Sequence, residues 1–194
     1  MKTDALFCDL KIKENIKILD VNEKIKMQFE NKYYNFQDKL FYEVMENCGG
    51  IVIDNWIRLY GCGELNVIDK NQMIKNDYNL DIIIGEDVIG GIFALKDNVV
   101  YYFAPDALEW ECLNIYYANF IHWLINDIQN VNLFYKDYRW NNWKEESKSL
   151  CLNQGFSLYP LLLSKCNIED RDRKIINIDE IIMRNFELKN KFIK

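Results

Sequence analysis

The sequence predicts an α+β fold in which antiparallel strands are flanked by helices. Three observations support it: a helical apolar pattern before residue 49, several short β-type runs between residues 51 and 113, and a second helical stripe after residue 115. Gaps of about three residues between the central β-type runs favour antiparallel hairpins, because a parallel crossover needs a dozen residues or more. Helix, strands and helix in this order indicate an α+β domain.

The first helix is predicted from Glu23 to Cys48. Its apolar residues recur at the spacing of one helical face, and Gly49-Gly50 then provides a glycine C-cap. The run IVIDNWIRLYG is predicted to be one strand ending at Gly61, and ELNVI a short second strand.

The segment from Asp81 to Glu111 is predicted to be the centre of the sheet. It contains the β-type runs DIII, VIGGIFAL and VVYYFA, separated by 85–87 (Gly-Glu-Asp) and by the turn 96–98 (Lys-Asp-Asn). Gly90-Gly91 is interpreted as a bulge or sharp bend within a strand. Pro105 interrupts pairing, and LEWECL resumes as a further strand.

The remaining elements follow from the same patterns. Residues 115–128 predict a helix with one apolar stripe, and residues 132–152 predict a helix interrupted by a loop. FSLYPLLL is expected to be extended up to Pro160, and KIINI to be a strand. Asn177, three residues before Glu180, resembles the start of a final helix.

Length and composition favour one domain spanning residues 1–194. Of these residues 49% are apolar, enough for a core without staples, and no linker-like stretch divides the chain. The opening MKTDALFCDL lacks a secretory pattern, and no apolar run approaches the ~20 residues that span a bilayer, so a soluble, cytoplasmic protein is expected. The six cysteines form no C-x-x-C pair, which favours buried, reduced thiols over a disulfide framework.

The charge is unevenly distributed. The chain carries −6, but residues 81–135 hold eight acidic residues against Lys96 alone, a net of −7, whereas residues 171–194 carry +3. Phosphate backbones would be repelled by the acidic segment and only weakly attracted by the basic tail, so nucleic acid is not expected as a partner. The lack of a long apolar run likewise predicts no membrane partner.

Cofactor and metal sites are not expected. His122 is the only histidine, which removes metal sites built on histidine pairs, and its apolar neighbours favour a structural role. Gly61-Cys62-Gly63 and Gly90-Gly91 both lack the spacing of a phosphate-binding loop.

Glu109 and Glu111 form the best candidate for catalysis. They flank Trp110 in a predicted strand, so their side chains leave the same face ~7 Å apart, close enough to share a cation or to act as an acid/base pair. An acid-dependent hydrolase is therefore one hypothesis. The alternative is a solvated polar face, which is common for acids at this spacing.

A protein-binding surface is the leading hypothesis. Aromatic rings surrounded by carboxylates suit a basic protein partner, because rings supply desolvated area and acids supply steering. The rings of this segment are expected either on that surface or in the core. The candidate partner-binding residues are Asp87, Asp106, Glu109, Trp110 and Glu111.

Three signatures carry a family resemblance: GG-x-FAL at 90–95, YYFAPD-x-LEWE at 101–111 and GFS-x-YP at 155–160. With these, residues about 40–165 are similar to a bacterial family of unknown function, and the order of motifs resembles the SUKH superfamily of Smi/Knr-like proteins. The resemblance implies a twisted antiparallel sheet and a non-enzymatic role, either neutralisation of a toxin by direct binding or regulation of a protein partner. It supplies no catalytic residues.

Overall fold

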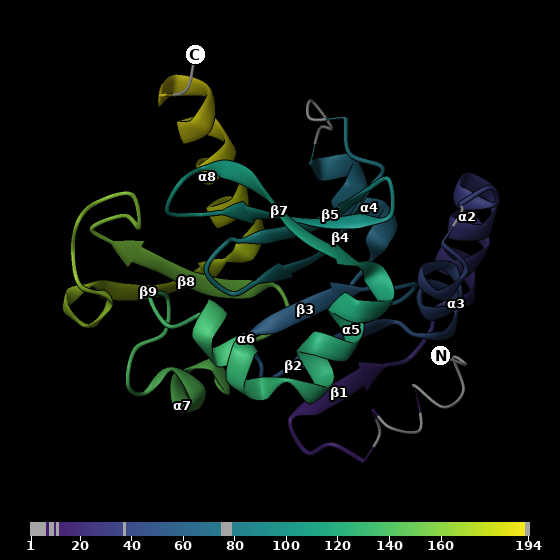
Figure 1. The fold of residues 1–194 in the computed structure, drawn as a ribbon, viewed down its shortest axis with the longest axis horizontal. Helices are drawn as coiled ribbons and strands as arrows, with labels where there is room; N and C mark the ends of the chain where they lie inside the picture. The colour runs from purple at the N-terminus through teal and green to yellow at the C-terminus, as the bar shows by residue number, and fades with distance from the viewer. Residues whose placement is uncertain (1–6, 8–9, 11, 37, 75–78, 193–194) are drawn as a thin grey trace.

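The computed structural model describes residues 7, 10, 12–36, 38–74 and 79–192. Its centre is a seven-stranded antiparallel sheet whose strands lie in the order of the chain (Figure 1). The α+β class predicted from the sequence is confirmed. The strands of the sheet are β1 (Ile16–Leu19), β2 (Gly50–Ile53), β3 (Ile57–Tyr60), β4 (Ile82–Asp87), β5 (Ile92–Lys96), β6 (Val99–Ala104) and β7 (Glu109–Tyr116).

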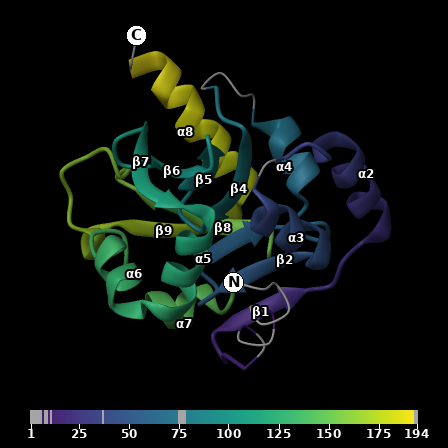
Figure 2. The same cartoon turned by 45° about the vertical axis from the view of Figure 1, so that its right-hand side comes forward.

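Helices and a separate hairpin surround this sheet. The hairpin pairs β8 with β9 and lies between α8 and the α6–α7 region in both views (Figures 1 and 2). These elements are α2 (Glu23–Tyr33), α3 (Lys39–Asn47), α4 (Val67–Met73), α5 (Tyr117–Asn126), α6 (Ile128–Phe134), α7 (Trp143–Ser147), β8 (Gln154–Tyr159), the 3-10 turn η1 (Ile168–Asp170), β9 (Asp172–Asn177) and α8 (Ile178–Phe192).

Two neighbouring residues of β6 show how the layers are built. Successive side chains of a strand point to opposite faces. Tyr102 packs against Phe134 of α6, with ring centroids 5.0 Å apart, whereas Phe103 packs against Phe186 of α8 at 4.7 Å. The sheet is therefore covered by α5 and α6 on one face and by α8 on the other.

The predicted first helix is two helices. α2 ends at Tyr33, and α3 begins after Asp38, whose side chain accepts a hydrogen bond of 2.9 Å from the Phe41 amide. The apolar period continues across the break because Phe36 still packs against Phe41, at 4.7 Å between ring centroids. Periodicity alone therefore did not reveal the interruption, but the N-cap residue Asp38 marks it.

The next two predictions were also wrong in detail. IVIDNWIRLYG is a hairpin, β2 and β3, joined by Asp54, Asn55 and Trp56. Asp54 and Asn55 adopt positive φ, and the Trp56 amide donates a hydrogen bond of 2.9 Å to the Ile53 carbonyl. ELNVI is not a strand, because Asn66 caps α4 and accepts hydrogen bonds from the amides of Ile68 and Asp69.

The central strands follow the prediction, with one shift at their connection. Residues 85–87, predicted to separate two strands, are the end of β4. Gly90-Gly91 lies in the connection to β5 and not within a strand, and Gly90 has a φ of +88°. Asp97 and Asn98 form the predicted turn between β5 and β6. The helix after β7 begins at Tyr117 as a buried stripe, but Asp127 starts a separate helix, which leaves Ile128 exposed.

Candidate partner-binding surface

β7 is an edge strand of the sheet. It pairs with β6 on one side, and among the described residues no strand pairs with its other side. Whereas every residue of β4 is buried, β7 contains no buried residue along its eight positions. A register shift opposite Val99–Tyr101, where Asn114 has a φ of +55°, limits the regular ladder to residues 109–112. Along this part of β7 the residues are therefore exposed or half-exposed, and no described strand occupies its outer edge.

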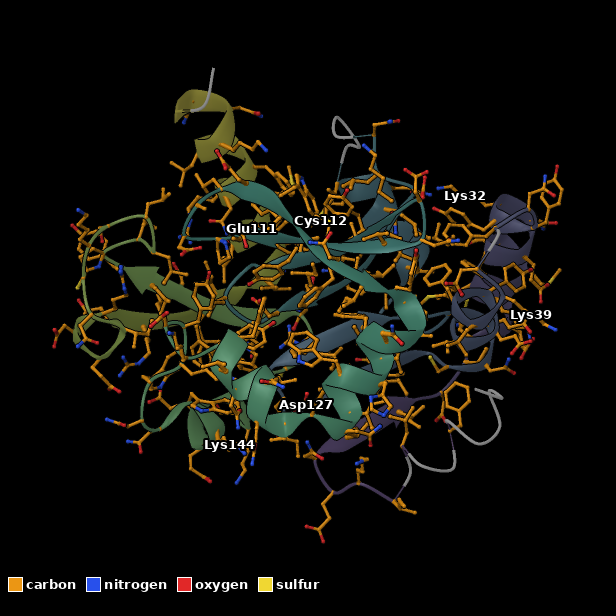
Figure 3. All side chains as sticks on the ribbon, in the orientation of Figure 1. Lys32, Lys39, Glu111, Cys112, Asp127 and Lys144 are labelled. Atoms are coloured by element: carbon orange, nitrogen blue, oxygen red, sulfur yellow. The ribbon has the colours of Figure 1, made fainter. Side chains whose placement is uncertain are left out.

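Three exposed acidic residues gather around this strand: Asp106, Glu109 and Glu111, here called the acidic surface. Glu109 and Glu111 lie opposite Ala104 and Tyr102 in the register, so both occupy the α5/α6 side of the sheet. Figure 3 shows Glu111 beside Cys112 on this strand. The spacing and shared face predicted for the two glutamates agree with their register.

Tyr138 connects the acidic surface to the end of α6. Its hydroxyl donates a hydrogen bond of 2.6 Å to Asp106. Burial is the main cause of the raised pKa of Tyr138. The hydrogen bond to Asp106 and the negative charges of Asp87 and Glu111 raise this pKa further. Asp106 and Glu111 therefore influence the same phenol, although they come from a turn and a strand.

Trp110 occupies the opposite side of β7 and is only half-exposed. Its ring lies 5.3 Å from Phe103, which in turn packs on Phe186 of α8. The ring therefore anchors β7 to α8 and leaves only part of its area for a partner. The ammonium of Lys189 in α8 lies 5.5 Å from the same Phe103 ring. Burial lowers the pKa of Lys189, whereas the negative charge of Glu109 raises it.

Asp87 belongs to the interior and not to a surface. It is fully buried and accepts four hydrogen bonds, from the hydroxyls of Tyr102 (2.7 Å) and Tyr135 (3.2 Å) and from the amides of Ile89 (3.1 Å) and Gly91 (2.9 Å). Burial raises its pKa, and these four hydrogen bonds oppose the rise. We therefore remove Asp87 from the candidate partner-binding residues, since no partner can reach it in this structure.

A second buried carboxylate, which the sequence did not single out, lies beside Asp87 on the opposite face of β4. Glu86 is fully buried and receives hydrogen bonds from the Tyr60 hydroxyl (2.5 Å) and the Lys70 ammonium (3.1 Å). The guanidinium of Arg58, which is 2% exposed, lies 3.6 Å away. Lys70 also pairs with Asp179 at the start of α8. The charged side chains of this network come from β3 (Arg58), β4 (Glu86), α4 (Lys70) and α8 (Asp179), and they link these four elements.

This network ends at a groove of about 570 Å³. Lys70 lines the groove with Asp69, Asp179 and the loop 151–153, whose Cys151 carbonyl accepts a hydrogen bond of 3.1 Å from Arg58. Neither Glu109 nor Glu111 lines it, nor do they line the groove of about 440 Å³ beside Asp81 and Asp97.

The histidine and cysteine expectations have mixed outcomes. His122 is exposed on α5, contrary to the environment that its apolar neighbours suggested. Cys48 and Cys62 are buried free thiols, and burial raises the pKa of each to about 12. Cys112 and Cys151 are free but exposed, Cys166 is half-buried, and Cys8 lies outside the described residues. Within the described ranges, no group of three or more metal-binding side chains occurs.

No helix in the described part of the chain has the length and apolar character needed to cross a membrane.

The fold and its exposed edge define an α+β domain with an acidic strand at the margin of an antiparallel sheet. The chain belongs to the family described as "Protein of unknown function DUF2625", whose model matches residues 12–181. It is 32% identical over 156 residues to the putative uncharacterized protein YbfG of Escherichia coli, covering 74% of this chain and 71% of that protein. An uncharacterized protein of Haemophilus influenzae is 32% identical over 167 residues, covering 77% of this chain and 72% of that protein.

Proposed function

We propose that this chain is a non-enzymatic protein-binding domain whose acidic surface recognises a basic partner. The observation that carries the proposal is the position of Glu109 and Glu111, which are exposed side by side on an edge strand. Asp106 adds a third carboxylate nearby, and the Tyr138 hydroxyl bonded to it gives the surface an aromatic component. Carboxylates in this arrangement steer a basic partner and fix its orientation.

The buried part of the acidic segment sharpens this proposal. The acidic segment 81–135 has eight acidic residues. Two of them, Glu86 and Asp87, are buried, and their carboxylates form hydrogen bonds and ion pairs within the protein. The remaining acids are not fully buried, so the segment keeps a negative exterior even after its interior charges are compensated. Residues whose charges are not required for the core are those available for a partner.

The SUKH resemblance of the motif order supports one kind of partner. Proteins of that superfamily often neutralise a toxin by direct binding, so we propose a basic toxin domain as the partner and immunity as the role. Binding to a regulatory partner is the other form of the same proposal. Both forms require the acidic surface.

The competing proposal is an acid-dependent hydrolase that uses Glu109 and Glu111. Such an enzyme needs a cleft that holds substrate between two carboxyls. The two glutamates project from a strand and line neither of the grooves described above. This geometry favours binding over hydrolysis.

Affinity capture from cells of the source organism tests the proposal. Wild type is compared with Glu109→Lys/Glu111→Lys and with the control Glu145→Lys/Glu187→Lys, which changes the net charge equally at exposed sites outside β7. We expect a basic protein to be captured by wild type and by the control but lost from the β7 variant. Calorimetry with that purified protein should then show binding at least tenfold weaker for the β7 variant.

Equal capture by all three proteins would refute the acidic surface as the binding site. Expression of the captured protein alone, and together with the chain, separates the two forms of the proposal. Growth arrest that the chain relieves supports immunity, whereas unaffected growth supports a regulatory partner.

A further inference from the structure

The outer edge of β7 offers more than a charged surface. An edge strand presents about half of its amide and carbonyl groups outward, where they can pair with another chain. β7 is eight residues long, twice the length of β1 at the opposite edge, and no described strand covers it. We propose that the partner contributes an extended segment that adds to the sheet as a strand beside β7. This inference rests on the proposed function and specifies how the same surface binds.

The charges on β7 indicate the sequence of that segment. Glu109 and Glu111 stand two positions apart on one face, a repeat of ~7 Å along a strand. Side chains of an added strand that lie on the same face repeat at the same interval. A segment with lysine or arginine at alternate positions would therefore place one base beside each glutamate.

The length of the regular ladder limits the length of the segment. Residues 109–112 pair with β6 without interruption, and the register then shifts towards Asn114. A bulge increases local twist and disrupts pairing, so a straight partner strand fits best along the first half of β7. We expect four to six residues of the partner to pair, on the order of the typical strand length.

A second copy of this chain fits the edge less well. Antiparallel pairing of two β7 strands keeps each face of the combined sheet continuous. Glu109 and Glu111 of both copies would then lie on one face, with four carboxylates close together. Like charges across a strand pair are destabilising, so the acids favour a basic segment and oppose self-association.

Fluorescence anisotropy with three labelled octapeptides tests strand addition. The first alternates lysine and threonine, the second has the same sequence with N-methyl groups on alternate amides along the edge that would face β7, and the third has four lysines followed by four threonines. All three carry the same charge. We expect the alternating peptide to bind, and the N-methylated peptide to bind at least tenfold more weakly because its backbone donors are blocked.

The chain variants complete the test. Glu109→Lys/Glu111→Lys should abolish binding of the alternating peptide, whereas Glu145→Lys/Glu187→Lys should leave its affinity within twofold. Hydrogen exchange of the β7 amides should slow when the alternating peptide is bound. Far-ultraviolet circular dichroism of each variant shows whether the fold is retained.

The outcomes separate this inference from the proposed function. Equal binding of the methylated and unmethylated peptides, lost in the β7 variant, would overturn strand addition and leave the acidic surface intact. Failure of all three peptides would also overturn it, and the capture experiment above then decides the proposed function independently. Salt screens the repulsion between carboxylates. If the chain dimerised through β7 when salt was added, the acidic residues would serve only to prevent self-association, and the inference would be overturned.

Discussion

Tyr102 donates a hydrogen bond of 2.7 Å to Asp87 in the interior, joining β6 to the end of β4. Gly91 lies against both groups, and a Cβ at this position would overlap the Tyr102 hydroxyl and the Asp87 carboxylate. The GG-x-FAL signature, through Gly91, and the YYFAPD-x-LEWE signature, through Tyr102, therefore meet at the buried carboxylate of Asp87. Their common role is to join β4, β5 and β6 in the interior of the domain.

Removing the Tyr102 hydroxyl should destabilise the fold. Tyr102→Phe keeps the ring but leaves Asp87 with one donor fewer in a site without water access, which costs about 1–3 kcal/mol. Urea denaturation measures this loss. Tyr101→Phe is the matched control, because its ring is half-exposed on the opposite face of β6, and it should change the free energy of unfolding by less than about 0.5 kcal/mol. Equal losses for the two variants would contradict the role of Asp87.

The buried Asp87 also predicts a pH dependence. Burial raises the pKa of this carboxyl above its ordinary value of 3.8, so the folded state holds the proton more tightly than the unfolded state. Its contribution to stability is therefore fully present below about pH 4 and is lost as the pH rises through the folded pKa. In Asp87→Asn this loss is absent.

Denaturation of wild type and Asp87→Asn between pH 3.5 and pH 7.5, as a rough working range for a carboxyl, measures the effect. The stability of wild type relative to the variant should fall as the pH rises. A relative stability that increases with pH would mean that the donors Tyr102, Tyr135, Ile89 and Gly91 outweigh burial.

The two carboxylates that pair with Lys70 should differ sharply in importance. Glu86→Gln leaves the buried Arg58 guanidinium without its countercharge, which costs about 3–5 kcal/mol. Asp179→Asn removes a carboxylate that is 41% exposed and should cost at most about 1 kcal/mol. Urea denaturation of both variants at neutral pH compares them. Similar costs would show that Arg58 finds another partner or reaches water.

Local sequence patterns predicted most of the sheet because its central strands are short apolar runs separated by turn residues. The apolar residues on both sides of Asp54-Asn55 predict one continuous strand, although this turn-forming pair divides β2 from β3 in the structure. In the same way ELNVI was assigned by its apolar content, whereas the cap formed by Asn66 determines a helix. In both cases a polar residue, in the turn at Asp54-Asn55 or at the helix cap Asn66, determines the element and the apolar content does not.

The buried network was harder to predict because its members are far apart in the sequence. The sequence predicts Glu86 and Asp87 between two strands, whereas their burial in β4 depends on partners from other elements. Arg58, Lys70 and Tyr102 reach them only when the sheet has formed. For Glu109 and Glu111, in contrast, alternation along one strand was enough to predict that they share a face.

Arg139 holds the region after α6 against the β2–β3 hairpin. Its guanidinium lies 3.8 Å from the Trp143 ring, 4.6 Å from Tyr135 and 5.1 Å from Trp56, and it donates a hydrogen bond of 2.8 Å to Asn132. Burial lowers its pKa to about 10, which still leaves it charged at neutral pH. A planar guanidinium can stack on several rings at once, but an ammonium cannot.

Arg139→Lys should therefore cost about 1–2 kcal/mol, although the charge is kept, and should shift the tryptophan emission of Trp56 and Trp143. Lys144→Ala is the control, because Lys144 is exposed and its ammonium lies 5.3 Å from the same Trp143 ring. Its removal should change stability by about 0.5 kcal/mol or less. If the lysine variant at 139 matched wild type in both stability and emission, charge alone would suffice and the stacked geometry would have no energetic role.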